Sequence, residues 1–168
     1  LDYEMSDASF AGTTDGQILD SLSNIPSLSI VTDQDNLFGL EEGIYINSEE
    51  RGREWERPAS IELLWPDGTA GFQINAGLRI RGGYSRNDAN PKHAFRFFFR
   101  DGYDDGDLLY PMFGDEGASQ FANLDLRTSQ NYSWSFGNDN RNTLLRDVFW
   151  RDIMRQMGQP YTRSRYHH

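Results

Sequence analysis

Residues 72–100, FQINAGLRIRGGYSRNDANPKHAFRFFFR, decide the fold of this chain. Apolar and polar side chains alternate over residues 72–81, and a period of two is typical of a half-buried β-strand. After a polar interval, Phe95, Phe97 and Phe99 alternate with arginines in the same manner. We therefore predict two antiparallel strands joined by a glycine-containing turn.

The predicted turn is rich in groups that can bind an anion. Gly82 and Gly83 let backbone N–H groups approach a ligand closely. Further donors come from the side chains of Arg81, Ser85, Arg86 and Lys92. One interpretation is a phosphate-binding hairpin, in which a glycine turn covers nucleotide phosphates and a lysine on the next strand pairs with them, as in protein kinases. The other is a surface hairpin with a solvated cationic face, because Gly82-Gly83 is not the full kinase glycine motif.

The composition limits the classes of partner. Asp and Glu number 26 against 16 Lys and Arg, which gives a formal net charge of −10. This charge argues against general binding to nucleic acid, whose phosphates would be repelled. Cysteine is absent, which excludes disulfides and thiolate metal sites. No apolar run approaches the ~18 residues that a bilayer span needs, so we expect no membrane insertion of this segment.

The whole pattern predicts an α+β fold with a mostly antiparallel sheet and one main helix. Residues 1–24 are expected to form an arm or linker, with a short helix at residues 15–22 as the alternative, and residues 25–168 one domain. Besides the hairpin, strands are expected at residues 28–32, 43–46, 61–65 and 121–126.

The main helix is expected over residues 142–157, with Asn142 as its N-cap and Gly158 and Pro160 beyond its end. Its apolar stripe comprises Leu144, Leu145, Val148, Phe149, Ile153 and Met157.

Asp147 on this helix has two candidate partners. In a kinase-like arrangement an acidic helix residue orients the strand lysine, which makes Asp147 a partner for Lys92. The preferred alternative is an intrahelical pair with Arg151, four residues further on.

Three other groups of residues could form sites. The acidic loop contains Asp101, Asp104, Asp105 and Asp107, and it could hold calcium. Tyr103 and Met112 stand where an EF-hand needs carboxylates, so a solvated turn fits better. Trp55 and Trp65 could line a sugar platform, although aromatic side chains at this density are more often core. The three histidines, His93, His167 and His168, have no spacing that indicates zinc or a Ser/His/Asp triad.

Taken together, these segments resemble the CotH kinase family, named for a spore-coat protein H. The match is centred on GLRIRGGYSR at residues 77–86 and PKHAFRF at residues 91–97. It continues through LDLR at 124–127, NTLLRD at 142–147 and MGQP at 157–160, and upstream through residues 25–33, 36–38, 43–46 and 51–58. The resemblance covers about residues 25–168, and the combination is more specific than any single motif.

The resemblance implies the amino-terminal half of an atypical kinase fold. It implies a secreted or cell-surface protein kinase that binds ATP with Mg²⁺ or Mn²⁺ and transfers the γ-phosphate to Ser or Thr of a surface or coat protein. It implies that Lys92 pairs with the phosphates, and that Asp147 is a candidate for orienting it. The residues expected near the nucleotide are Arg81, Gly82, Gly83, Ser85 and Arg86.

The family's later portion supplies the catalytic base and the metal-binding aspartates, and we expect it to lie outside this segment. The segment would then supply nucleotide contacts without turnover of its own. Two rival classes stay open: a carbohydrate-binding or adhesion module that uses Trp55, Trp65 and exposed tyrosines, and a structural surface or coat protein without catalysis.

Overall fold

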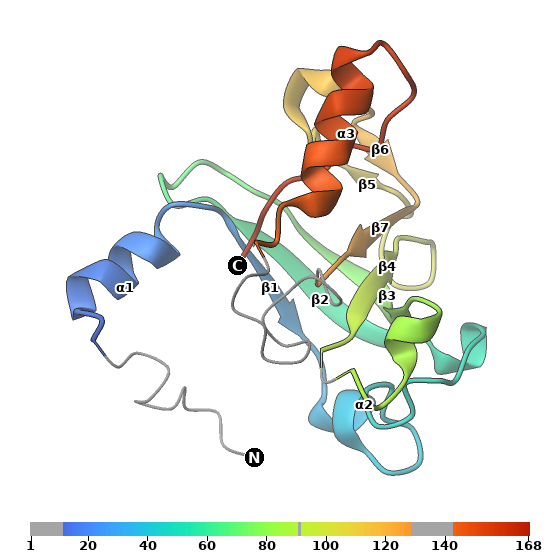
Figure 1. The fold of residues 1–168 in the computed structure, drawn as a ribbon. Coiled ribbons are helices and arrows are strands. Elements are labelled where there is room, and N and C mark those ends of the chain that lie inside the picture. The colour runs from blue at the N-terminus through green and yellow to red at the C-terminus, as the bar shows by residue number, and fades with distance from the viewer. Residues whose placement is uncertain (1–11, 91, 129–142) are drawn as a thin grey trace.

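The computed structural model describes residues 12–90, 92–128 and 143–168. Its centre is a five-stranded sheet in the order β1-β2-β3-β4-β7, in which every neighbouring pair is antiparallel (Figure 1). The strands are β1 (Ser27–Val31), β2 (Arg57–Leu64), β3 (Gln73–Arg81), β4 (Ala94–Phe98) and β7 (Asn123–Leu126). The predicted mixed α+β fold with a mostly antiparallel sheet is confirmed.

The β3–β4 hairpin has the predicted alternation of faces. Leu78 lies opposite Phe97 and Ile80 lies opposite Phe95; Leu78, Ile80 and Phe97 belong to the core cluster, and Phe95 packs against it. Arg79 lies opposite Arg96 on the other face of the same strand pair. One face of the sheet is therefore apolar, and the arginines are gathered on the opposite face.

The segment at residues 43–46 is not the strand that its sequence predicts. Ile44 is buried, as expected, but its N–H donates to the carbonyl of Asn36, and the N–H of Tyr45 donates to Leu37. These acceptors belong to α2 (Gln34–Phe38), a short helix that was not predicted and that Asp33 caps through the N–H of Asp35. Because α2 uses these backbone donors, the segment forms turns and not a sheet ladder.

The predicted strand at residues 121–126 is divided into two. β6 (Gln120–Phe121) pairs with β5 (Leu108–Leu109) in a separate two-stranded sheet, whereas β7 pairs with β4. Between them the carbonyl of Ala122 accepts the N–H of Phe99 at 2.9 Å. The division leaves β7 as an edge strand of the main sheet, paired with β4, which carries Arg96.

The main helix α3 (Arg146–Gln156) is shorter than predicted. The expected cap Asn142 lies outside the described residues, and Leu145 occupies the N-cap position. The predicted end is confirmed, because Gly158 donates to Arg155 and Gln159 donates to Met154, which is a Schellman motif. No residue of α3 is buried, so its apolar stripe covers the sheet only in part.

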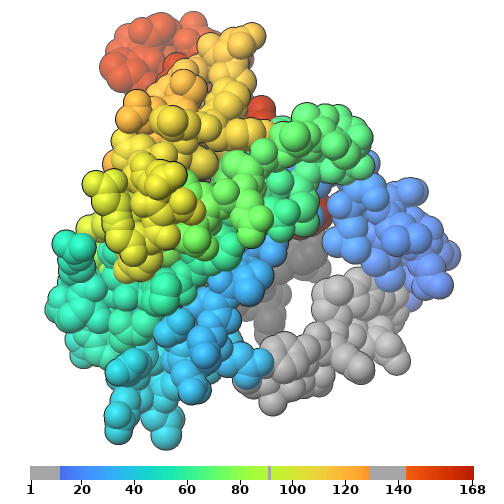
Figure 2. All heavy atoms as spheres, turned by 180° about the vertical axis from the view of Figure 1, so that it is seen from behind, coloured from blue at the N-terminus to red at the C-terminus, as the bar shows by residue number. Residues whose placement is uncertain are grey.

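Helix α1 (Asp15–Leu22) confirms the helical alternative for the amino-terminal region. Thr14 and Gln17 form a capping box at its start, and none of its residues is buried. The helix projects to one side of the sheet (Figures 1 and 2). In the ranges that the structure describes, no helix is long and apolar enough to cross a membrane.

Candidate anion-binding site at the β3–β4 hairpin

The turn between β3 and β4 depends on glycine at one position. Gly82 has φ +130°, and a Cβ at this position would come within 2.0 Å of the Ser85 hydroxyl oxygen. Residues other than glycine rarely adopt this backbone conformation. The chain then forms a 3₁₀ turn, η3 (Tyr84–Arg86), whose Tyr84 carbonyl accepts a hydrogen bond from the buried Asn90 amide at 3.0 Å. Gly82 is therefore required for the shape of the turn.

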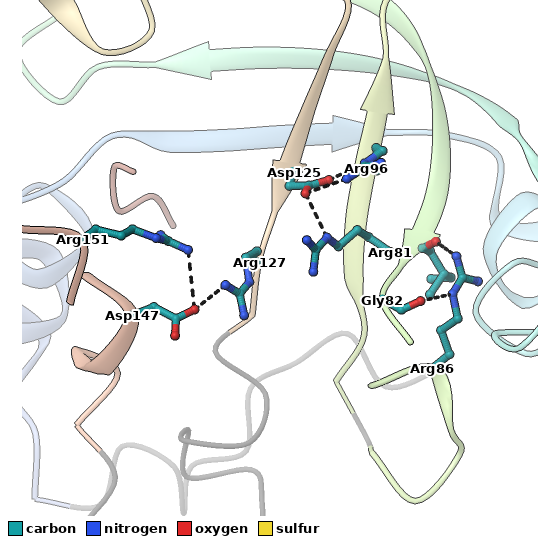
Figure 3. Close-up of polar contacts among 9 residues, drawn as sticks. Arg81, Gly82, Arg86, Arg96, Asp125, Arg127, Asp147 and Arg151 are labelled. Atoms are coloured by element: carbon teal, nitrogen blue, oxygen red, sulfur yellow. Dashed lines mark hydrogen bonds and ion pairs between the residues drawn. The ribbon is translucent and has the colours of Figure 1, made fainter. Parts of the chain in front are cut away.

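Arg86 links this turn to neighbouring segments of the backbone by hydrogen bonds. Its guanidinium donates to the carbonyl oxygens of Ser48 at 2.9 Å, Glu50 at 2.8 Å and Gly82 at 2.8 Å, and also to that of Ile80. Figure 3 shows the bond to Gly82. A guanidinium has five N–H donors, so four hydrogen bonds leave little capacity for a ligand. Burial lowers the pKa of Arg86, with a smaller contribution from the charge of Arg51. The positive charge of Arg86 is held by carbonyls, and none of these four acceptors is a carboxylate.

A cavity of about 450 Å³ lies beside the turn, and we call it the basic pocket. Its lining includes Gly82, Gly83 and the ring of Phe98. The arginines that line it are Arg51, Arg79, Arg81, Arg86 and Arg96. A pocket of this size is within the range of small-molecule sites.

Asp125 bridges two of these arginines from the neighbouring strand. Its Oδ2 lies 2.9 Å from Nε of Arg81 and 2.8 Å from Nη2 of Arg96, and its Oδ1 contacts Nε of Arg96 (Figure 3). Burial acts to raise the pKa of Asp125, but the hydrogen bond from Arg96 and the charges of Arg81 and Arg96 outweigh it, so the pKa is lowered. Asp125 is therefore ionised and holds both guanidinium groups in place.

Glu56, the residue before β2, pairs with a third lining arginine. Its side chain is 1% exposed, and Oε2 lies 3.3 Å from Nε of Arg79 and 3.1 Å from Nη2 of Arg100. Both guanidinium groups lie over the ring of Phe98, at 3.8 and 4.7 Å from its centroid. Arg79 is thus fixed by an ion pair and by stacking at the same time.

The basic pocket keeps a positive character in an acidic chain. Among the described residues, the carboxylates that contact its five arginines are Glu56 and Asp125, and Glu56 is shared with Arg100. Arg51 is exposed at the rim, and Glu54 lies close enough to act on the charge of Arg79. The sequence pattern indicated a cationic face here but did not identify Glu56 or Asp125 as its anionic partners.

Lys92 and Asp147 are not brought together. Lys92 is exposed at the start of β4 and does not line the basic pocket. Asp147 accepts a hydrogen bond from Arg127, and its Oδ2 lies 3.5 Å from Nη2 of Arg151 (Figure 3). The preferred alternative, the intrahelical pair with Arg151, is therefore confirmed, and the partners that Asp147 contacts are Arg127 and Arg151. Arg127 directly follows β7 and is the residue that donates this hydrogen bond to Asp147.

A second and larger cavity adjoins the basic pocket. It measures about 790 Å³ and lies between the apolar face of the sheet and α3, with Phe97 and Val148 in its walls. Arg81 lines both cavities, and Asp125 lines the larger one. The Arg81–Asp125 pair therefore stands where the two cavities meet.

The other predicted sites find little support. In the acidic loop, the carboxylate of Asp104 accepts the N–H groups of Asn75 and Asp105, which lowers its pKa, so it acts as a turn residue. Within residues 12–90, 92–128 and 143–168, no group of three or more His, Asp or Glu is placed to hold a metal ion. Arg57 lies over the ring of Trp55 and Arg165 over that of Trp65, so neither tryptophan presents two free faces to a sugar.

No family model, no curated protein and no solved structure matches the chain.

Proposed function

We propose that the basic pocket binds the phosphate groups of a nucleotide, ATP with Mg²⁺ or Mn²⁺. The observation that carries the proposal is the convergence of four arginines beside a glycine turn that Arg86 holds in shape, with two carboxylates in contact with them. These four arginines are Arg51, Arg79, Arg81 and Arg96. Guanidinium groups match the geometry of phosphate oxygens and keep their charge at any physiological pH. The glycine turn leaves Gly83 exposed and without a side chain at the mouth of the pocket.

The wider proposal is that the chain contributes these contacts to a CotH-like protein kinase. The sequence resemblance described above supports it, and it implies an extracellular or cell-surface location and a Ser or Thr acceptor on a surface or coat protein. The pair between Arg127, the residue after β7, and Asp147 of α3 adds a structural argument, because kinases also join a cation carried by the sheet to an acidic residue on a helix. Lys92 stays a phosphate contact that the resemblance implies; its side chain is exposed and does not line the basic pocket.

A thermal-unfolding screen tests the proposal against its rivals. ATP with Mg²⁺ or Mn²⁺ should raise the melting temperature in a concentration-dependent way, because a ligand that binds only the folded state stabilises it. A panel of oligosaccharides should leave it unchanged. Stabilisation by sugars alone would favour a carbohydrate-binding module. An unchanged melting temperature with both ATP and sugars would favour a structural protein without catalysis.

A pair of variants connects the binding to the basic pocket. Arg51→Ala removes a rim arginine, and we expect it to weaken ATP binding by about tenfold, the effect of losing one charge-assisted contact. Arg53→Ala is the matched control, since Arg53 is also exposed but does not line the pocket. Equal effects of the two variants would contradict this location.

A further inference from the structure

The larger cavity, between the apolar face of the sheet and α3, has an apolar interior. It measures about 790 Å³. Side chains from three strands of the sheet and from α3 line it, and they include Leu28, Ile61, Phe97, Leu124, Leu126 and Val148. A cavity of this size is within the range of small-molecule sites, and its walls favour a ligand with an apolar body.

One wall of this cavity is the segment at residues 161–167. Two contacts hold the segment in place. The hydroxyl of Tyr166 donates to the carbonyl oxygen of Leu144 at 3.0 Å, and the N–H of Leu28 in β1 donates to the carbonyl oxygen of His168 at 2.9 Å. The segment is therefore linked both to the start of α3 and to the edge of the sheet, so the cavity has its shape without a ligand.

This wall carries two arginines that have no acidic partner. Arg163 and Arg165 are exposed and line the cavity, which places them at its mouth. Their guanidinium groups lie over the rings of Tyr161 and Trp65. Among the described residues, no carboxylate forms an ion pair with either of them. Stacking on a ring leaves the N–H donors at the edge of a guanidinium available to an anion.

The same wall contains a buried nitrogen without a hydrogen-bond partner. This atom is Nε2 of His167, which also lines the cavity. A carboxyl group suits such a nitrogen in both of its protonation states. The neutral ring accepts a hydrogen bond from the acid form, and the protonated ring donates one to the carboxylate. Both arrangements share a single proton between ligand and imidazole.

We propose that the larger cavity binds a long-chain carboxylic acid. The apolar chain of the ligand lies between the sheet and α3, and its carboxyl group lies beside Arg163, Arg165 and His167. The inference goes beyond the proposed function, since it concerns another cavity and another class of ligand. An apolar interior with unpaired cations at its mouth is complementary to a molecule with an apolar body and one negative charge.

The experiment compares three probes, decanoate, hexanoate and decanol, by calorimetry on the 168-residue chain at concentrations below micelle formation. Each buried methylene strengthens binding by up to about fourfold, so decanoate should bind at least about tenfold more tightly than hexanoate. Decanol has the same chain without the charge, and it should bind at least about fivefold more weakly than decanoate.

Three variants locate the ligand. Val148→Trp fills the cavity from α3, none of whose residues is buried, and it should weaken decanoate binding by at least about tenfold. Arg165→Ala removes a cation at the mouth and should weaken decanoate binding by about threefold to fivefold, with decanol binding unchanged. Arg53→Ala is the control, because Arg53 is exposed and lines neither cavity.

Other outcomes overturn the inference. Equal affinities for decanoate and hexanoate would show that the chain is not buried, and equal affinities for decanoate and decanol would show that the carboxyl group is not recognised. These comparisons need only the wild type, so they decide the matter even where a variant does not fold. Arg51→Ala, in the basic pocket, should leave decanoate binding unchanged, and a loss there would assign the ligand to the basic pocket.

Discussion

The carboxylate of Glu56 lies directly against Gly77 of β3. A Cβ at position 77 would come within 2.4 Å of Oε1, so the absence of a side chain there makes room for the buried acid. Glu56 then reaches Arg79 and Arg100 on the arginine-bearing face. The absence of a side chain at Gly77 thus makes room for Glu56, which lies outside the hairpin, to pair with two arginines of the hairpin.

We expect Glu56→Ala to destabilise the protein and to weaken anion binding together. Removing the acid leaves two arginines without their partner, and breaking a buried pair costs about 3–5 kcal/mol, less here because both arginines are partly exposed. Urea unfolding measures the stability, and calorimetry with tripolyphosphate measures the binding. Glu41→Ala at another exposed position is the control, and an equal loss of stability in both variants would contradict the role of Glu56.

Two adjacent glycines should respond differently to alanine. Gly82→Ala requires a side chain at φ +130° and a Cβ in contact with Ser85, and we expect a loss of about 1–3 kcal/mol in the free energy of unfolding. Gly83→Ala has no atom within 4 Å of the added Cβ and a negative φ, so its effect should stay within about 0.5 kcal/mol. Chemical denaturation of both variants tests this, and similar losses would show that the turn has another conformation.

The lowered pKa of Asp125 predicts a pH dependence of stability. Its folded pKa lies below the unfolded value of about 3.9, so its contribution is complete above the unfolded pKa and disappears as pH falls through the folded pKa. The free energy of unfolding of the wild type should therefore fall more steeply than that of Asp125→Asn in this acidic window. Urea unfolding from pH 6 down to about pH 2 measures it. Parallel curves for the two proteins would contradict the ion pairs of Asp125.

Lys92 is the only lysine in the chain, which allows a direct test of its predicted role. An amine-reactive reagent should modify its exposed side chain, and ATP with Mg²⁺ should protect it if the amine contacts the phosphates. Peptide mass spectrometry quantifies the modification, with the amino-terminal amine as an internal control. Lys92→Ala should likewise reduce ATP affinity, by about tenfold. Unchanged labelling and unchanged affinity would remove Lys92 from the site.

The β3–β4 hairpin could be predicted because the alternation of apolar and polar residues that determines it lies within two short stretches of sequence. Alternation over residues 72–81 and 95–99 fixes which side chains enter the core, and the register of β3 and β4 follows that pattern. The ends of α3 could be predicted in part, since Gly158 supplies the left-handed residue of a Schellman motif.

The partners of the arginines could not be predicted in this way. Asp125 lies 29 residues from Arg96, and Glu56 lies 44 residues from Arg100, so each pair depends on how distant strands are placed. The error at residues 43–46 has a similar origin. Ile44 has the apolar character of a strand residue, but its backbone is bonded to the end of α2. Local pattern fixes burial more securely than it fixes the hydrogen-bond partners of the backbone.

Because Arg86 fastens the turn through four carbonyls, the loop has its shape before any ligand arrives. A preformed loop loses little conformational entropy on association, so affinity would not be diminished by an ordering step. Exchanging Arg86 for lysine would keep the charge yet supply a single ammonium for carbonyls that lie in several directions. Arg86 therefore contributes to binding indirectly, because its hydrogen bonds make the turn and the neighbouring segments rigid.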